Sequence, residues 1–137
     1  MKFIKIIVPF FLIFFSIQDI SAQVYRFKAD SFSIIEKNTN GKWGKWSDVN
    51  KIPVVITLDG TKDRIVINSQ EIQIYNILAY GEKVVEKNKE TIPMKCADNS
   101  GGLCTIFIVT RTNEGNRKQF YINYDDVKIV YNVNVSK

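Results

Sequence analysis

Histidine is absent from this chain of 137 residues. Its absence removes the commonest general base and metal ligand, and also the Ser-His and Cys-His pairs that activate nucleophiles. The chain has no glycine-rich phosphate loop and no spaced acidic metal loop either. We therefore expect a protein that is not an enzyme and has no cofactor and no metal. Two carboxylates across a cleft, as in glycosidases, need no histidine, and sequence spacing leaves that arrangement open.

Long apolar runs are also scarce, and the single one lies near the N-terminus. Residues 6–15 are almost entirely apolar and follow two lysines, and a Ser-Ala pair ends at Ala22. This order is typical of a secretory signal peptide, and the run is short for a membrane span. We expect residues 1–22 to be removed and residues 23–137 to form one domain with no membrane span; an uncleaved N-terminal anchor is the alternative. The mature protein would be periplasmic, on the cell surface or extracellular.

The charge of the chain is only mildly basic. The formal net charge is +5, and the lysines alternate with acidic residues. A solvated surface explains this pattern better than a groove for nucleic acid, so we expect no nucleic-acid partner.

Residues 92–135 predict four short strands joined by three tight turns. Glycine or acidic residues mark these turns at 99–101, 113–115 and 125–126. For the second turn, a two-residue turn at 114–115 is the alternative. It would slip the pairing by one residue and exchange the two faces of the strand. The preferred turns place one set of side chains on a common core face: Ile92, Met94, Cys96, Cys104, Ile106, Ile108, Phe120, Ile122, Tyr124, Val127, Ile129, Tyr131 and Val133.

The two cysteines face each other in this meander. The turn with Gly101 places Cys96 opposite Cys104, and we expect a position without backbone hydrogen bonds between them. The Cα atoms of such a pair are about 4.5 Å apart, which is within disulfide reach. Export favours a Cys96–Cys104 disulfide, and two reduced, buried thiols are the alternative.

The first half of the domain predicts further strands. Residues 24–29 and 31–36 indicate an edge strand broken at Asp30. Residues 54–58 and 64–67 indicate a hairpin whose turn, Asp59-Gly60-Thr61-Lys62, places Ile56 opposite Ile65. Residues 72–87 predict one long strand, bent by a bulge at Gly81. The turns before and after this strand place Ile74 opposite Ile65 and Val85 opposite Ile92. A second core face would contain Val54, Ile56, Leu58, Ile65, Ile67, Ile72 and Ile74. The fold class is therefore all-β, an antiparallel meander of about seven or eight strands in a small barrel or closed sandwich.

Two Gly-Lys-Trp triplets stand side by side at residues 41–46. Exposed indole rings at Trp43 and Trp46 would form a platform for a sugar or a protein, and Lys42 and Lys45 would favour anionic groups. Alternatively, one or both rings close an open end of the barrel. On a strand, positions three apart face opposite sides, so we expect Trp43 inside as a plug and Trp46 on the surface.

A second candidate surface lies on the outer side of the C-terminal meander. The predicted pairing places Phe107, Tyr121 and Val130 side by side there. An exposed apolar stripe of this kind can mark a binding site. In the alternative reading, the strand at residues 24–35 covers it.

The Gly-x-Trp triplets followed by a meander resemble the lipocalins and the wider calycin barrels. The resemblance implies that Trp43 or Trp46 closes one barrel end near its start. Those barrels often pair this tryptophan with an arginine on the last strand, and here no arginine follows Arg117. The Ser-Ala-Gln junction and the Lys/Asn/Ile-rich composition also resemble small exported all-β proteins of unknown function that are frequent in Bacteroidetes. That resemblance implies export and no particular activity.

These features predict an exported binding domain for a glycan, a protein or another unknown ligand. The alternative is a lipocalin-like carrier of a small apolar molecule. A carrier needs a lined, empty interior, whereas a surface binder has a filled core and exposed aromatic side chains.

Processing is the first testable expectation. Exported protein should begin at Gln23, because the small residues before it form the cleavage junction. N-terminal sequencing of protein recovered from outside the cytoplasm measures this directly. A mature chain that still begins at Met1 would contradict the expectation.

Overall fold

The computed structural model describes residues 23–133, so the expected signal peptide lies outside the described part. Nine strands and no helix occur within it. The strands are β1 (Val24–Glu36), β2 (Val54–Asp59), β3 (Arg64–Asn68), β4 (Ile72–Tyr80), β5 (Val84–Val85), β6 (Lys89–Asp98), β7 (Leu103–Arg111), β8 (Arg117–Asn123) and β9 (Val127–Val133).

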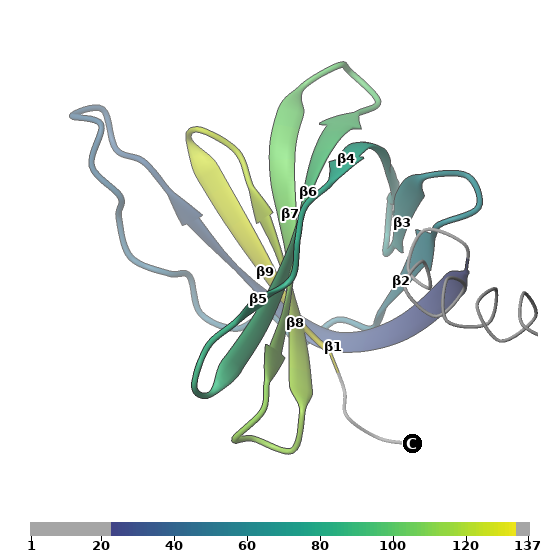
Figure 1. Ribbon diagram of the computed structural model, residues 1–137. Coiled ribbons are helices and arrows are strands. Elements are labelled where there is room, and N and C mark those ends of the chain that lie inside the picture. Colours follow the sequence, from purple (N-terminus) through teal and green to yellow (C-terminus); the bar gives the residue numbers. More distant parts are fainter. Residues whose placement is uncertain (1–22, 134–137) are drawn as a thin grey trace, which may run out of the picture.

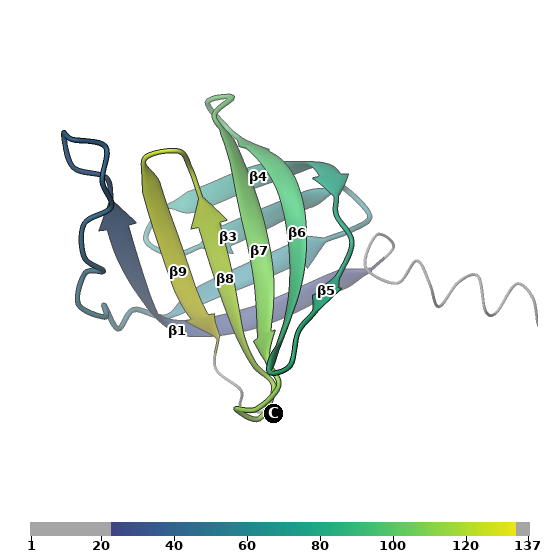
Figure 2. The ribbon, with the colours of Figure 1, turned by 60° about the vertical axis from the view of Figure 1, so that its left-hand side comes forward.

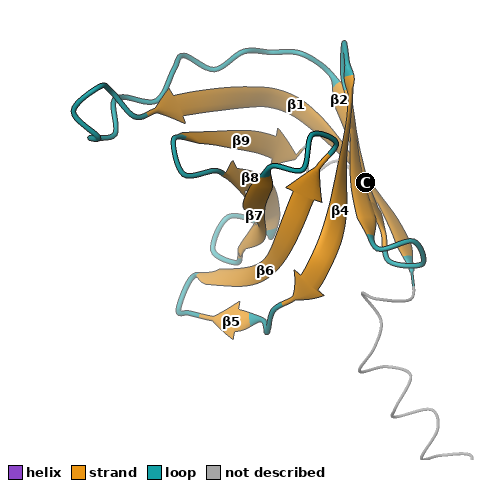
Figure 3. Ribbon diagram, turned by 90° about the horizontal axis from the view of Figure 1, so that it is seen from above, coloured by secondary structure: helices purple, strands orange, loops and turns teal. Residues whose placement is uncertain are grey.

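Eight of these strands close into an antiparallel barrel (Figures 1 and 2). Consecutive barrel strands pair with each other, and β9 returns to pair with β1. β4 and the short β5 pair with successive parts of β6. The view from above follows the strands around the closed wall (Figure 3). The prediction of an all-β meander is confirmed, and the barrel is compatible with a lipocalin-like fold.

β1 connects two walls of the barrel, one formed by β2, β3 and β4 and the other by β6, β7, β8 and β9. Its first half, Val24 to Ala29, pairs with β2, and its second half pairs with β9. The register shifts between Ala29 and Ser31, so the expected irregularity at Asp30 is confirmed. The expected edge position is wrong, because a strand of 13 residues is long enough to pair with both walls.

The C-terminal meander has the predicted registers. Cys96 lies opposite Cys104, and Ile108 lies opposite Phe120. Gly101 has the positive φ (+85°) that its turn requires. The second loop is longer than expected because β7 ends at Arg111, but its register is the predicted one.

The pairing of β2 with β3 differs from the prediction by two residues. Ile56 lies opposite Ile67, whereas we expected it opposite Ile65. Asp59 remains in β2, and its carboxylate accepts hydrogen bonds from the backbone N–H groups of Thr61 and Lys62 (3.0 and 3.2 Å). The turn therefore begins one residue later than expected. A shift of two residues keeps the same side chains inside.

The pairing of β3 with β4 differs by one residue, which changes the face. Ile65 lies opposite Tyr75 instead of Ile74. A one-residue slip moves the core set to the other side of the strand. Tyr75 and Ile77 are therefore buried, whereas Ile72 is 62% exposed, and the expected core positions of Ile72 and Ile74 are wrong.

The bulge in this strand lies at Leu78 and not at Gly81. The register with β6 shifts between Ile77 and Ala79. Gly81 instead closes on β6: its N–H donates to the Pro93 carbonyl (2.8 Å), and a Cβ atom there would lie 2.6 Å from Pro93 Cγ.

After this contact, β5 pairs with β6 two residues away from the expected register. Val85 lies opposite Glu90, whereas we expected Ile92. The N–H of Glu86 donates to the carbonyl of Lys89 (2.7 Å), so residues 87–88 form the turn.

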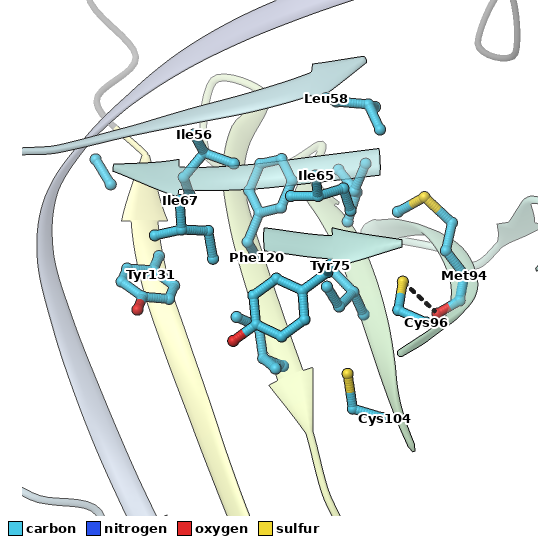
Figure 4. Close-up of a cluster of buried hydrophobic side chains, with 14 of the residues drawn as sticks. Ile56, Leu58, Ile65, Ile67, Tyr75, Met94, Cys96, Cys104, Phe120 and Tyr131 are labelled. Atoms are coloured by element: carbon cyan, nitrogen blue, oxygen red, sulfur yellow. Dashed lines mark hydrogen bonds between the residues drawn. The ribbon is translucent and has the colours of Figure 1, made fainter. Parts of the chain in front are cut away.

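Side chains from both walls fill the barrel interior (Figure 4). The Phe27 and Phe120 rings pack with their centroids 5.1 Å apart. The largest fully buried side chains are Phe120, Ile56, Leu58, Ile65, Ile67, Met94, Ile106, Ile122, Val54 and Cys96. A cavity of about 180 Å³ lies at one barrel end, beside Phe32 and Tyr131.

The face change in β4 predicts unequal effects of one substitution at two positions. Ile77→Ala should cost about 2–5 kcal/mol of unfolding free energy, because Ile77 is 7% exposed. Ile72→Ala, the matched control on the same strand, should change it by about 0.5 kcal/mol or less. Urea denaturation of both variants measures this. A larger loss of stability for Ile72→Ala than for Ile77→Ala would contradict this register and support the one expected from the sequence.

Candidate functional site

A groove of about 370 Å³ lies on the outer side of the barrel wall. Figure 2 shows β9, β8, β7 and β6 side by side, with the loop after β1 at one margin and β5 at the other. Phe107 and Tyr121 are directly opposed on β7 and β8, and both are half-buried. The groove is lined by Val84, Glu86, Lys89, Thr91, Phe107, Val109, Arg111 and Tyr121.

The loop with the tryptophans runs along the free edge of β1. Its N–H groups donate to carbonyls of β1: Gly44 to Glu36 (2.8 Å) and Ser47 to Ile34 (2.7 Å). Three residues of the loop thus span two residues of β1. This extra residue acts as a bulge and changes the alternation of sides between Trp43 and Trp46.

Trp43 lies outside the barrel. Its ring contacts two ammonium groups, Lys128 Nζ at 4.4 Å and Lys37 Nζ at 5.3 Å from the ring centroid. It is not part of the core cluster. The expectation that Trp43 plugs the barrel is therefore wrong, and the interior is filled by side chains such as Phe120 instead.

Trp46 is on the surface, as expected, and reaches the second candidate surface. It is 44% exposed, and its ring stands edge-on to Tyr121 with 6.4 Å between the centroids. The structure therefore joins two features that are 75 positions apart in the sequence. The strand at 24–35 does not cover Tyr121, because the second half of β1 extends the same sheet beside β9.

The remaining candidates occupy different positions. Val130 is on the same outer face but is only 7% exposed. It therefore packs beneath its neighbours and offers little surface to a ligand. Lys45 is exposed and lines a separate hollow of about 500 Å³ beside Glu36. Lys42 is exposed in the loop and does not line the groove.

Arg111 is a groove residue that the sequence analysis missed. Its Nε donates to Gln119 Oε1 (3.0 Å), and its Nη2 donates to the Tyr121 hydroxyl (3.3 Å). Alternation along β7 gives the missing signal, since Phe107, Val109 and Arg111 share one face.

A row of polar side chains continues from Arg111 across the sheet. Gln119 Nε2 donates to Asn132 Oδ1 (2.9 Å), and Asn132 Nδ2 donates to Ser31 Oγ (3.1 Å). Gln119 and Ser31 are buried. Buried polar groups that are mutually hydrogen-bonded hold their neighbours in one geometry, so this row fixes Arg111 and Tyr121.

Cys96 and Cys104 are opposed, as predicted, but both are free thiols and the predicted disulfide is not formed. Asp98 donates its N–H to the Gly102 carbonyl (2.9 Å). Hydrogen-bonded and non-hydrogen-bonded pairs alternate, so the two cysteines form a hydrogen-bonded pair, where side chains lie farther apart. Figure 4 shows the two sulfur atoms separated, with Cys96 Sγ directed at the Met94 carbonyl (3.7 Å).

No family model, no curated protein and no solved structure matches this chain. Residues 23–133 contain no cluster of three or more His, Cys, Asp or Glu side chains that could hold a metal ion. That part of the chain also has no helix of the length and hydropathy needed to cross a membrane.

The thiols provide a prediction for pH dependence. Burial raises the pKa of Cys96 to about 12 and also raises that of Cys104, so both are protonated in the folded protein. At pH 8, a thiol reagent should react only slowly with the native protein. Once urea unfolds the protein, the same reagent should label two thiols. The folded state holds these protons more tightly, so its stability should decline as the pH rises above the ordinary thiol value of 9.0.

The protein is purified without a reducing agent, because such an agent would break a disulfide and expose two thiols in either case. Unfolded protein that shows no reactive thiol would mean that the disulfide forms after all. Rapid labelling of the native protein at pH 8 would contradict the buried positions of the sulfur atoms.

Proposed function

We propose that this protein is an exported, non-enzymatic binding protein that holds its ligand in the outer groove. The ligand presents flat, partly apolar faces, as the rings of a carbohydrate do. Export rests on the N-terminal sequence pattern, and the binding role rests on the outer surface of the barrel.

One observation carries the proposal: the aromatic side chains of Tyr121 and Phe107 line a single groove, and Trp46, which does not line it, contacts Tyr121. Trp46 stands edge-on to Tyr121, and Tyr121 lies directly opposite Phe107. Aromatic side chains provide a large contact area with few rotatable bonds, and they are enriched where proteins bind partners. The groove volume of about 370 Å³ lies in the range of small-ligand sites.

The geometry favours this function over the carrier. A carrier requires an empty interior of roughly 300–1,000 Å³. Here the interior is occupied by fully buried side chains, and the end cavity beside Tyr131 is about 180 Å³. A filled core and partly solvent-exposed aromatic side chains are the features of a surface binder.

Tryptophan fluorescence offers a direct test, because Trp43 and Trp46 are the only tryptophans of the chain. Titration with a panel of soluble polysaccharides should change the emission for the ligand that binds. Tyr121→Ala should then weaken binding by about 2 kcal/mol, the size of a hot-spot contact. Its urea midpoint should change much less than that of Phe120→Ala.

Leu103→Ala is the control, because Leu103 is 70% exposed and lies outside the groove. It should bind as the parent does. The proposal fails if Tyr121→Ala and Leu103→Ala bind alike. It also fails if native mass spectrometry of protein from its own host finds an apolar molecule retained.

A further inference from the structure

Arg111 is a cation without a counter-ion among the described residues. Salt bridges within residues 23–133 join Lys83 to Glu90, Lys89 to Glu86, and Arg117 to Glu114. Arg111 instead donates to two neutral groups, the amide of Gln119 and the hydroxyl of Tyr121. A half-buried guanidinium that is held only by neutral partners has donor capacity left for an anion.

The guanidinium is held in place before any ligand arrives. Gln119, its partner at 3.0 Å, is buried and is itself bonded to Asn132. The second partner, Tyr121, is an aromatic residue of the groove. Little side-chain freedom remains to be lost on binding, which favours affinity.

The other charged residues of the groove also favour an anionic ligand. Lys89 also lines the groove, and its partner Glu86 is 3.6 Å away, in an exposed pair. Such a pair is weak and is screened by salt. Arg111 therefore leaves this part of the groove with a positive charge that no carboxylate of the described residues neutralises.

We propose that Arg111 receives the carboxylate of an acidic sugar whose ring lies against Tyr121, so that the ligand is a glycan containing uronic acid. The inference rests on the proposed function and specifies its ligand class. The planar fork of arginine matches the two oxygens of a carboxylate. An aromatic ring beside a cation suits a molecule in which a carboxylate is attached directly to a ring.

An acidic protein partner fits less well. Specific protein interfaces bury about 800 Å² on each side and usually present a broad surface. Here the charge and the aromatic rings are concentrated in one hollow of about 370 Å³. A short stretch of a glycan chain matches this size better than a folded partner does.

The experiment compares ligands that differ only in the charged group. Polygalacturonate and alginate oligosaccharides are titrated against the full mature protein, each beside its carboxyl-reduced counterpart. We expect a uronate to bind and its reduced form to bind at least about tenfold more weakly, as for the loss of one charge-assisted contact. Binding should also weaken as salt is added.

Variants connect this difference to Arg111. Arg111→Gln should lose at least about tenfold in affinity for the uronate and should bind the carboxyl-reduced oligosaccharide as the parent does. Arg117→Gln is the matched control: Arg117 lies opposite Arg111, is outside the groove and is bonded to Glu114 at 2.7 Å. It should bind both ligands as the parent does. The ligand comparison stands even if Arg111→Gln folds poorly.

The outcomes separate the inference from the proposed function. Equal binding of uronate and reduced glycan, or binding of neutral glycans alone, would overturn the inference while the groove remains a glycan site. Tighter binding of poly-glutamate than of any uronate would also overturn it. Binding of no saccharide, with Tyr121→Ala unchanged in every assay, would overturn both.

Discussion

The barrel depends on a single strand that is shared by its two walls. β1 pairs with β2 up to Ala29 and with β9 from there on, and the register shift at Asp30 redirects it between them. If β1 stopped at Ala29, β9 would lose its second partner and the wall would stay open. The same length carries the free edge on which the tryptophan loop lies. Closure of the barrel and construction of the outer surface therefore depend on the same 13 residues.

Turn chemistry explains which half of the fold could be predicted. In the C-terminal meander, Gly101 occupies a left-handed position, so its place in the sequence determined the register. In the turn after β2, the left-handed residue is Asp63 and not a glycine, and Gly60 gave a misleading signal. The turn from β3 to β4 has neither glycine nor proline, and the slip there placed Ile74 on the wrong face.

The candidate site was predicted in part for a similar reason. Alternation along paired strands is regular, so Phe107 and Tyr121 could be placed on the outer face from the sequence alone. Trp43 could not, because its side depends on an extra residue in an irregular loop. Arg111 follows the same alternation as Phe107, but its importance depends on two neutral partners and a missing counter-ion, which only the assembled sheet reveals.

The short β5 has a consequence for how molecules of this protein meet one another. In the described part of the chain, the tryptophan loop lies along the open edge of β1, and β5 stands outside the ring of eight with an edge of its own. It offers an unpaired backbone edge, but over only two residues, Val84 and Val85. An edge this short gives a neighbouring chain little on which to continue the sheet. The protein can thus expose apolar side chains on its surface while offering little template for fibrous aggregation.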